Sequence, residues 1–261
     1  MPYTYLWNQV TSEGSRENIV TVDISTVAAR YPDGVSEYIS MSGYASYKYH
    51  FSNKLVSTMG ARYNWVTLNG QSTDVDAVTY GFDKFDIRNS SVNGSLGIAY
   101  LPTKLTKIDI VAYSGFRSPN IDDVGKVFEL DNENGMPIII IPNPELKPET
   151  AYNAEIGVSH NFYKKVKLYV VGYYSYLNNA IIRGELSLNG DTEVVINGVP
   201  SNLRGQVNTD KAYIYGGSAS LNAQLPFHFY LNSSFTITQG KDASNNQPLR
   251  HTTPNFGKTT L

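Results

Sequence analysis

One arginine and three carboxylates are the residues of this chain with the clearest potential for chemistry. Arg117 is followed closely by Asp122 and Asp123, and Glu149 lies where the next apolar–polar alternation begins. A guanidinium group can hold carboxylates through forked hydrogen bonds. We therefore expect Arg117 to fix the base of a loop through Asp122, Asp123 or Glu149. These four residues are also the candidate ligand-binding set, although shaping the loop is the simpler interpretation.

From the other titratable residues we expect no catalytic residue and no metal site, and we expect no cofactor. Cysteine is absent, and the four histidines are not at metal-ligand spacing: His50, His160, His228 and His251. Asp131, Glu133 and Gly135 match part of a calcium-binding loop, but so short a match is typical of an ordinary polar loop. No phosphate-binding glycine loop, nucleophile elbow or HExxH helix is present in the sequence.

The composition argues against nucleic acid as a partner and is compatible with a membrane protein. The net charge of −2 over 261 residues gives no basic face for nucleic acid. The mean hydropathy is −0.29, and no apolar run approaches the ~18 residues of a membrane helix. A β-barrel needs only alternate residues to be apolar, so its average resembles that of a soluble protein. Tyrosine, with 20 residues, is a side chain that favours water–lipid boundaries.

Eight stretches alternate apolar and polar residues with a period of two, which indicates strands with one apolar face, and two further stretches, 3–10 and 252–261, follow the pattern less regularly. In 149–162, for example, Tyr152, Ala154, Ile156 and Phe162 share one parity. The expected strands are 3–10, 38–51, 54–66, 88–101, 104–116, 149–162, 165–178, 210–225, 228–240 and 252–261. Residues 11–37 are ambiguous.

The connections between these strands alternate between tight turns and long loops. Short turns are expected near 52–53, 102–103, 163–164 and 226–227, and long loops at 67–87, 117–148, 179–209 and 241–251. Barrels of the outer membrane have short periplasmic turns and long extracellular loops. A secreted β-sandwich or β-solenoid is the alternative, but neither requires this alternation.

Aromatic residues mark both ends of the apolar face. On the turn side they are Tyr49, Phe51, Tyr100, Phe162 and Phe229, and on the loop side Tyr63, Trp65, Phe116, Tyr152, Tyr174, Tyr176, Tyr213 and Tyr215. Tilted strands place Tyr152 and Phe162 roughly 25 Å apart along a barrel axis, the height of a bilayer's apolar band. Charged residues fall on the other parity: Lys48, Arg62, Lys107, Asp109, Glu155 and Lys167. We therefore predict an all-β fold, a transmembrane antiparallel up-and-down barrel in contact with lipid.

Two boxes flank the loop 117–148. The first runs from Gly115 to Gly125 and includes Phe116, Arg117 and Pro119; the second runs from Asn143 to Glu149 and includes Pro144, Leu146 and Pro148. Together they closely resemble paired boxes in TonB-dependent outer-membrane receptors. The resemblance implies a barrel of about 22 strands with a plug in its lumen. Residues 1–261 would then be about ten internal strands of it, a partial barrel domain without the plug or the final strands.

The resemblance also implies a function. We expect the wall and extracellular loops of an outer-membrane receptor that takes up a scarce nutrient with energy from the TonB complex, contacted through the missing plug segment. The extracellular ligand could be a siderophore, cobalamin, a glycan or a peptide. No histidine lies between Arg117 and Lys147, which counts against haem. A passive porin or barrel adhesin is the alternative; a barrel enzyme is disfavoured because the loop carboxylates have no matching histidine.

Overall fold

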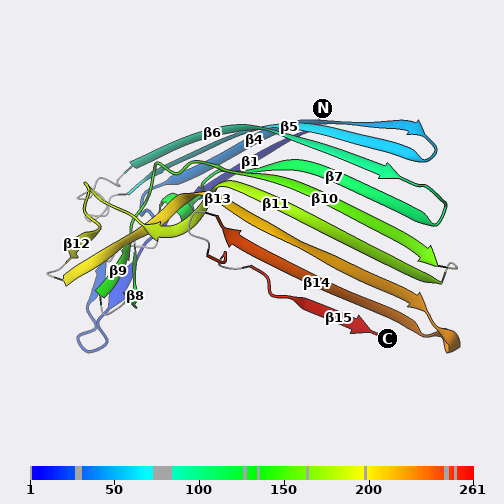
Figure 1. Ribbon diagram of the computed structural model, residues 1–261. Coiled ribbons are helices and arrows are strands. Elements are labelled where there is room, and N and C mark those ends of the chain that lie inside the picture. Colours follow the sequence, from blue (N-terminus) through cyan, green and yellow to red (C-terminus); the bar gives the residue numbers. More distant parts are fainter. Residues whose placement is uncertain are drawn as a thin grey trace.

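An arched, open antiparallel sheet dominates the structure (Figure 1). The computed structural model describes residues 2–26, 31–72, 84–125, 128–133, 136–162, 165–196, 199–243, 247–249 and 252–261. The sheet's main strands, in spatial order, are β1 (Tyr3–Val10), β4 (Ser36–Ser52), β5 (Leu55–Gln71), β6 (Lys84–Tyr100), β7 (Thr106–Arg117), β10 (Glu149–Phe162), β11 (Val166–Glu185), β13 (Val199–Gln224), β14 (Tyr230–Asp242) and β15 (Phe256–Thr260). Each pairs antiparallel with the next, which confirms the predicted up-and-down order.

Smaller elements lie in the connections. They are β2 (Ser15–Glu17), β3 (Ile24–Thr26), the helix α2 (Ile121–Val124), β8 (Phe128–Glu133), β9 (Met136–Ile140), β12 (Glu193–Ile196) and the 3₁₀ turn η1 (Pro226–His228). In the part of the chain that the structure describes, no helix is long and apolar enough to cross a membrane.

Short turns gather at one end of the sheet and long connections at the other, as Figure 1 shows. The short ones join β4 to β5, β6 to β7, β10 to β11 and β13 to β14, as predicted. The last of them holds Phe227 and His228 at positive φ, which tightens the turn. Tyr163 and Lys164, predicted as a turn, lie outside the described residues.

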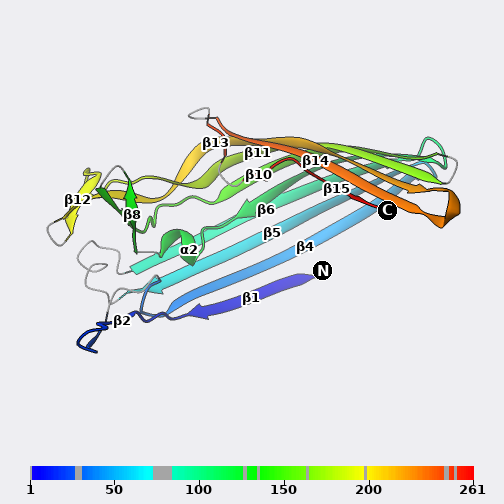
Figure 2. The same ribbon diagram turned by 90° about the horizontal axis from the view of Figure 1, so that it is seen from below.

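The two faces of the sheet differ as the alternation predicts. Outward positions carry exposed apolar side chains such as Tyr152 and Ile156. Inward positions carry polar side chains that bond across strands: Arg62 donates to Ser42 Oγ at 2.6 Å, and Tyr113 donates to Glu155 Oε1 at 3.0 Å. The helix α2 lies on the concave side of the arch (Figure 2). The concave face is therefore the polar one.

The β11–β13 hairpin is the largest departure from the predicted boundaries. The expected strand ends at 178 and 210 coincide with a break in pairing, where Asn179 (φ 54°) and Asp210 are skipped. Pairing then resumes and β11 continues to Glu185, so most of the predicted loop 179–209 is a hairpin. Backbone pairing does not need the apolar alternation that lipid imposes.

Other boundaries shift in the same direction. β5 extends to Gln71 instead of 66, and β6 begins at Lys84 instead of 88. The ambiguous segment 11–37 contains the β2–β3 hairpin and the first residues of β4. Each of these extensions lies at the long-loop end of the sheet.

Candidate functional site

Arg117 joins two carboxylates at the base of the longest connection, as the sequence predicts. Its Nη1 lies 2.7 Å from Asp123 Oδ2, and its Nε donates to Glu149 Oε2. Asp123 is 9% exposed and Glu149 19%, whereas Arg117 is 42% exposed. The guanidinium therefore ties the loop to the wall through two of its nitrogens, Nε and Nη1, and keeps part of its surface exposed.

Asp123 also caps the short helix in which it lies. The Asn120 side chain accepts a hydrogen bond from Asp123 N at 3.1 Å, and Asp123 Oδ2 accepts one from Asn120 N at 3.0 Å. This reciprocal pair is a capping box, which satisfies backbone donors at the start of a helix. The spacing of Asn120 and Asp123 in the sequence could have predicted it. Arg117 thus forms an ion pair with a carboxylate whose position is already fixed by the capping box.

Glu149 connects three strands. It lies opposite Arg117 in the β7–β10 ladder, and its Oε1 accepts a hydrogen bond from Ile181 N at 2.6 Å. Ile181 follows Asn179, where the β11–β13 pairing is interrupted. The carboxylate therefore supplies an acceptor to the strand beyond that interruption.

The second box forms the returning arm of the loop and docks on β13. Asn143 Nδ2 donates to Gln206 O at 2.9 Å. Lys147 N donates to Asn208 Oδ1 at 2.8 Å, and Asn208 Nδ2 donates back to Lys147 O at 2.9 Å. Asn208 was not among the predicted residues, because its partner lies 61 positions away in the sequence. Pro144 and Pro148, which stiffen the backbone, alternate with these contacts.

Both boxes contribute to an apolar core on the concave face. Leu146 from the second box is 5% exposed, and Val124 from α2 is fully buried. They pack against the inward residues Leu68, Phe85 and Ile87 of β5 and β6. The loop is therefore held inside the barrel wall by apolar burial as well as by the Arg117 ion pairs.

The first box also has buried and membrane-facing members. Pro119 is among the fully buried side chains, and Ser118 Oγ beside it accepts a hydrogen bond from Asn89 at 2.9 Å. Phe116 is half-buried and belongs to the outward aromatic set, opposite Thr150 in the ladder. The contacts of these residues are structural. Ligand binding by Arg117, Asp122, Asp123 and Glu149 stays a prediction.

Asp122 contacts a different loop from Asp123. It accepts a hydrogen bond from the Tyr31 hydroxyl at 2.6 Å, in the connection between β1 and β4. A neighbouring contact, from Ser72 Oγ to Asp33 Oδ1 at 2.8 Å, joins that connection to the end of β5. The bases of three connections are thus linked side by side. Of the three carboxylates offered to Arg117 by the sequence, Asp123 and Glu149 are seen to pair with it.

The isoleucine run 138–141 packs as an extended segment. β9 pairs in parallel with β13, and Ile141 N donates to Arg204 O at 2.9 Å. Ile139 and Ile141 form a second core with Leu203.

Of the calcium-like run, Gly135 lies outside the described residues. Among the residues described, no group of three or more His, Cys, Asp or Glu could hold a metal ion.

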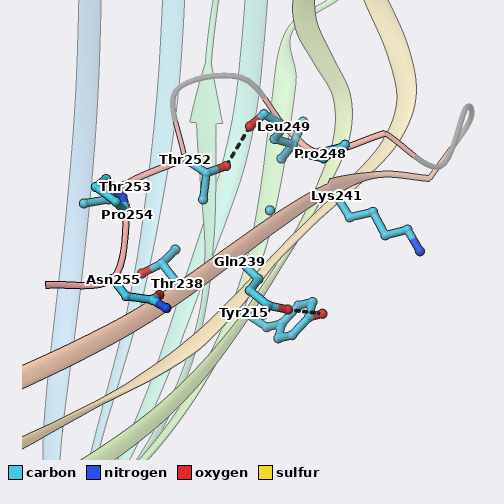
Figure 3. Close-up of a pocket in the computed structure, with 11 residues that line it drawn as sticks. Tyr215, Thr238, Gln239, Lys241, Pro248, Leu249, Thr252, Thr253, Pro254 and Asn255 are labelled. Atoms are coloured by element: carbon cyan, nitrogen blue, oxygen red, sulfur yellow. Dashed lines mark hydrogen bonds between the residues drawn. The ribbon is translucent and has the colours of Figure 1, made fainter.

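A second concavity lies between β14 and the chain that leads to β15 (Figure 3). It has a volume of about 500 Å³. Tyr215 donates to Gln239 Oε1 at 2.8 Å on one side, and Thr252 donates to Leu249 O at 2.9 Å on the other. The lining combines the cation Lys241 and several amide and hydroxyl groups with the apolar side chains of Leu249 and Pro254, so it is a notch of mixed polarity at the edge of the described sheet.

Comparisons with known proteins agree with this arrangement. A family model described as "TonB dependent receptor-like, beta-barrel" matches residues 3–261. The chain is 26% identical over 137 residues to the iron-regulated outer membrane virulence protein of Vibrio cholerae, covering 51% of this chain and 20% of that protein. It is 23% identical over 147 residues to a probable hemoglobin and hemoglobin-haptoglobin-binding protein 4 of Haemophilus influenzae, covering 55% of this chain and 14% of that protein. The chain thus spans a fifth or less of these relatives.

Solved structures show the same fold at low sequence identity. The copper transporter OprC superposes with a TM-score of 0.73 at 13% identity, over 98% of this chain and 37% of that one. The Serratia marcescens hemophore receptor HasR has a TM-score of 0.65 at 17% identity, over 98% and 42%. The siderophore receptor PirA from Acinetobacter baumannii has a TM-score of 0.57 at 18% identity, over 95% and 42%. The arched sheet corresponds to part of a larger barrel in each.

Proposed function

Because this chain belongs to the TonB-dependent receptor β-barrel family, we propose that it forms wall and extracellular loops of a receptor that actively imports a scarce nutrient. The family match along residues 3–261 carries this proposal. One relative is named as an outer membrane protein, and the outer membrane is the location of this chain. Family members are transport receptors. We therefore propose that this chain acts in transport and has no enzymatic role.

The anchored loop between β7 and β10 supports a receptor over a plain pore. The ion pairs of Arg117 and the burial of Leu146 hold this loop on the concave face, where it occupies the lumen side of the wall. A passive porin requires an open aqueous bore. A loop that is held inward and has the half-exposed Arg117 at its base fits a receptor that binds its ligand before transporting it.

The names of the relatives and of the solved neighbours point to iron- or copper-bearing compounds as the nutrients to consider. One curated relative is named for iron regulation and another for hemoglobin binding, and solved neighbours include copper, siderophore and hemophore receptors. The lack of histidine between Arg117 and Lys147 still disfavours haem held by this loop. We therefore propose a siderophore-bound metal as the first ligand class to test, with cobalamin and glycans as further candidates.

Uptake by cells that carry the complete gene tests the proposal. A strain deleted for the gene should grow poorly under iron limitation with a supplied siderophore and recover when the gene is restored. Recovery should be lost when TonB is absent or when an uncoupler collapses the proton gradient, because active import requires that coupling. Uptake that persists without TonB would favour the passive porin. Surface attachment without any uptake defect would favour the adhesin.

A further inference from the structure

The outward face of β10, β11, β13 and β14 contains an apolar hollow of about 1070 Å³. It lies where the outward side chains are smallest: Gly172 stands opposite Gly217 in the β11–β13 ladder, and Val170 opposite Ala219. Longer side chains around it include Ile156, Tyr174, Tyr215, Phe235 and Ile237. Because this face meets lipid, the hollow is a place where a hydrocarbon chain can lie below the level of the surrounding side chains.

Tyrosines form a continuous cluster on the loop side of the hollow. Tyr152 stacks on Tyr176 with ring centroids 6.2 Å apart, Tyr176 meets Tyr213 at 5.5 Å, and Tyr213 meets Tyr174 at 5.9 Å. Tyrosine rings favour the level of lipid headgroups. The cluster therefore marks the boundary of the outer leaflet directly above the hollow.

Two lysines come next along the same strands. Lys241 pairs with Tyr213 in the β13–β14 ladder, and Lys211 lies two residues before Tyr213 on the same face. Such diagonal neighbours have Cβ atoms within about 7–8 Å. Both side chains are exposed, and Figure 3 shows Lys241 extending away from β14. The outward positions of 150–162, 166–178, 211–223 and 231–241, whose side chains the structure describes, carry no Asp or Glu.

We propose that this surface binds one membrane lipid with a phosphate-bearing headgroup. The phosphate lies between Lys211 and Lys241, the glycerol or sugar region lies against the tyrosine cluster, and an acyl chain occupies the hollow at Gly172 and Gly217. Ladder register places these features in consecutive rows of the same strands, from apolar to aromatic to cationic. The site is on the outside of the barrel and does not depend on which nutrient passes through it.

Native mass spectrometry of the complete receptor in detergent tests this site. Phosphatidylglycerol and diacylglycerol with the same acyl chains are the probes, because they differ in the phosphate headgroup. The double variant Lys211→Gln, Lys241→Gln should retain about 5-fold less phosphatidylglycerol than the wild type, as expected for the loss of two partly exposed charge contacts. Its retention of diacylglycerol should not change.

Gly172→Leu tests the hollow separately. A Cβ at Gly172 would meet nothing closer than Gly216 O at 3.9 Å, so the leucine can fill the hollow without disturbing the ladder. It should reduce the retention of both lipids. Gly94→Leu is the matched control, since its Cβ would also meet only a carbonyl oxygen, Gly60 O, at 3.9 Å, on an outward position away from the hollow. Lys84→Gln is the control for the lysines.

Two results would overturn the site. One is equal retention of phosphatidylglycerol and diacylglycerol by the wild type. The other is a lysine double variant that retains as much phosphatidylglycerol as Lys84→Gln. Gel mobility before and after heating shows whether each variant is a folded barrel. If Gly172→Leu does not fold, the lysine comparison still decides.

Discussion

Arg117 and Glu149 stand directly opposite each other in the β7–β10 ladder, and the chain between them is the loop that they anchor. Their ion pair closes a connection whose ends are 32 positions apart in the sequence. Asp123 and Ile181 extend the contact to α2 and β11. A change at this point is therefore expected to act on the whole loop.

Replacing Arg117 by Ala should release α2 from the wall. Two carboxylates would lose their charged partner, and because the guanidinium is 42% exposed we expect a loss of loop-docking free energy of only about 1–2 kcal/mol. Arg117→Lys should recover part of it, since an ammonium cannot make the forked contact. Hydrogen exchange of residues 118–125 in the complete receptor measures the effect.

Arg88→Lys provides the matched control for Arg117→Lys. Arg88 also pairs with a carboxylate, Asp86, but in an exposed pair in which Arg88 is 71% exposed. It should leave exchange in the loop unchanged. Equal protection of the loop in Arg117→Ala and the wild type would show that apolar burial alone holds it.

Replacing Leu146 by Ala should loosen the same loop by a different route. The side chain is 5% exposed and packs with Val124, Leu68 and Ile87, so its truncation leaves a cavity worth about 2–5 kcal/mol. Proteolysis within the loop should become faster while the barrel itself stays folded. Leu105→Ala, at a turn residue 39% exposed, is the control and should have no such effect.

The membrane-crossing part of this fold could be read from the sequence. Both ends of the 149–162 strand were predicted as observed, because lipid on one side and water on the other impose alternation from Tyr152 to Phe162. Beyond Asn179 that contrast ends, and the strand continues on backbone pairing and on contacts with Leu203 and its neighbours. The predicted loop there was wrong for this reason.

The candidate site was predictable only where its partners lie close in sequence or belong to the two boxes. Arg117 with Asp123 and Glu149 fulfilled the expectation. The acceptors and donors on other strands, Asn208 and the Ile181 N–H, did not follow from local pattern because they depend on which strands become neighbours. The role of Asp123 as a helix cap was available from its spacing to Asn120 but was missed.

Replacing Gly216 by Ala should impair barrel folding. The inward position of Gly216 is covered by the Tyr173 side chain, whose hydroxyl meets Thr238 Oγ1 at 2.6 Å, and a Cβ there would overlap the Ile237 carbonyl oxygen. Such overpacking costs about 1–3 kcal/mol. The fraction of complete receptor that migrates as a folded barrel without heating should fall.

Gly97→Ala is the control for this effect. Gly97 also points inward, but its Cβ would meet only Thr58 O, at the ordinary distance of 3.8 Å. We expect it to fold like the wild type. A Gly216→Ala receptor that folds as completely as Gly97→Ala would show that Tyr173 and the β14 backbone at Ile237 can both move aside at no cost.

Spin labels along β10 should report the two faces of the wall. Ala154 and Ile156 point outward, while Asn153 and Glu155 point inward, where Asn153 accepts a hydrogen bond from Ser175 at 2.6 Å and Glu155 accepts one from Tyr113. Oxygen dissolves in hydrocarbon, whereas a nickel chelate stays in water. In the complete receptor reconstituted in bilayers, labels at 154 and 156 should be accessible to oxygen, and labels at 153 and 155 to nickel. Accessibility that does not alternate along these four positions would contradict the assignment of lipid and lumen on which the outward lipid site and the inward loop anchor both depend.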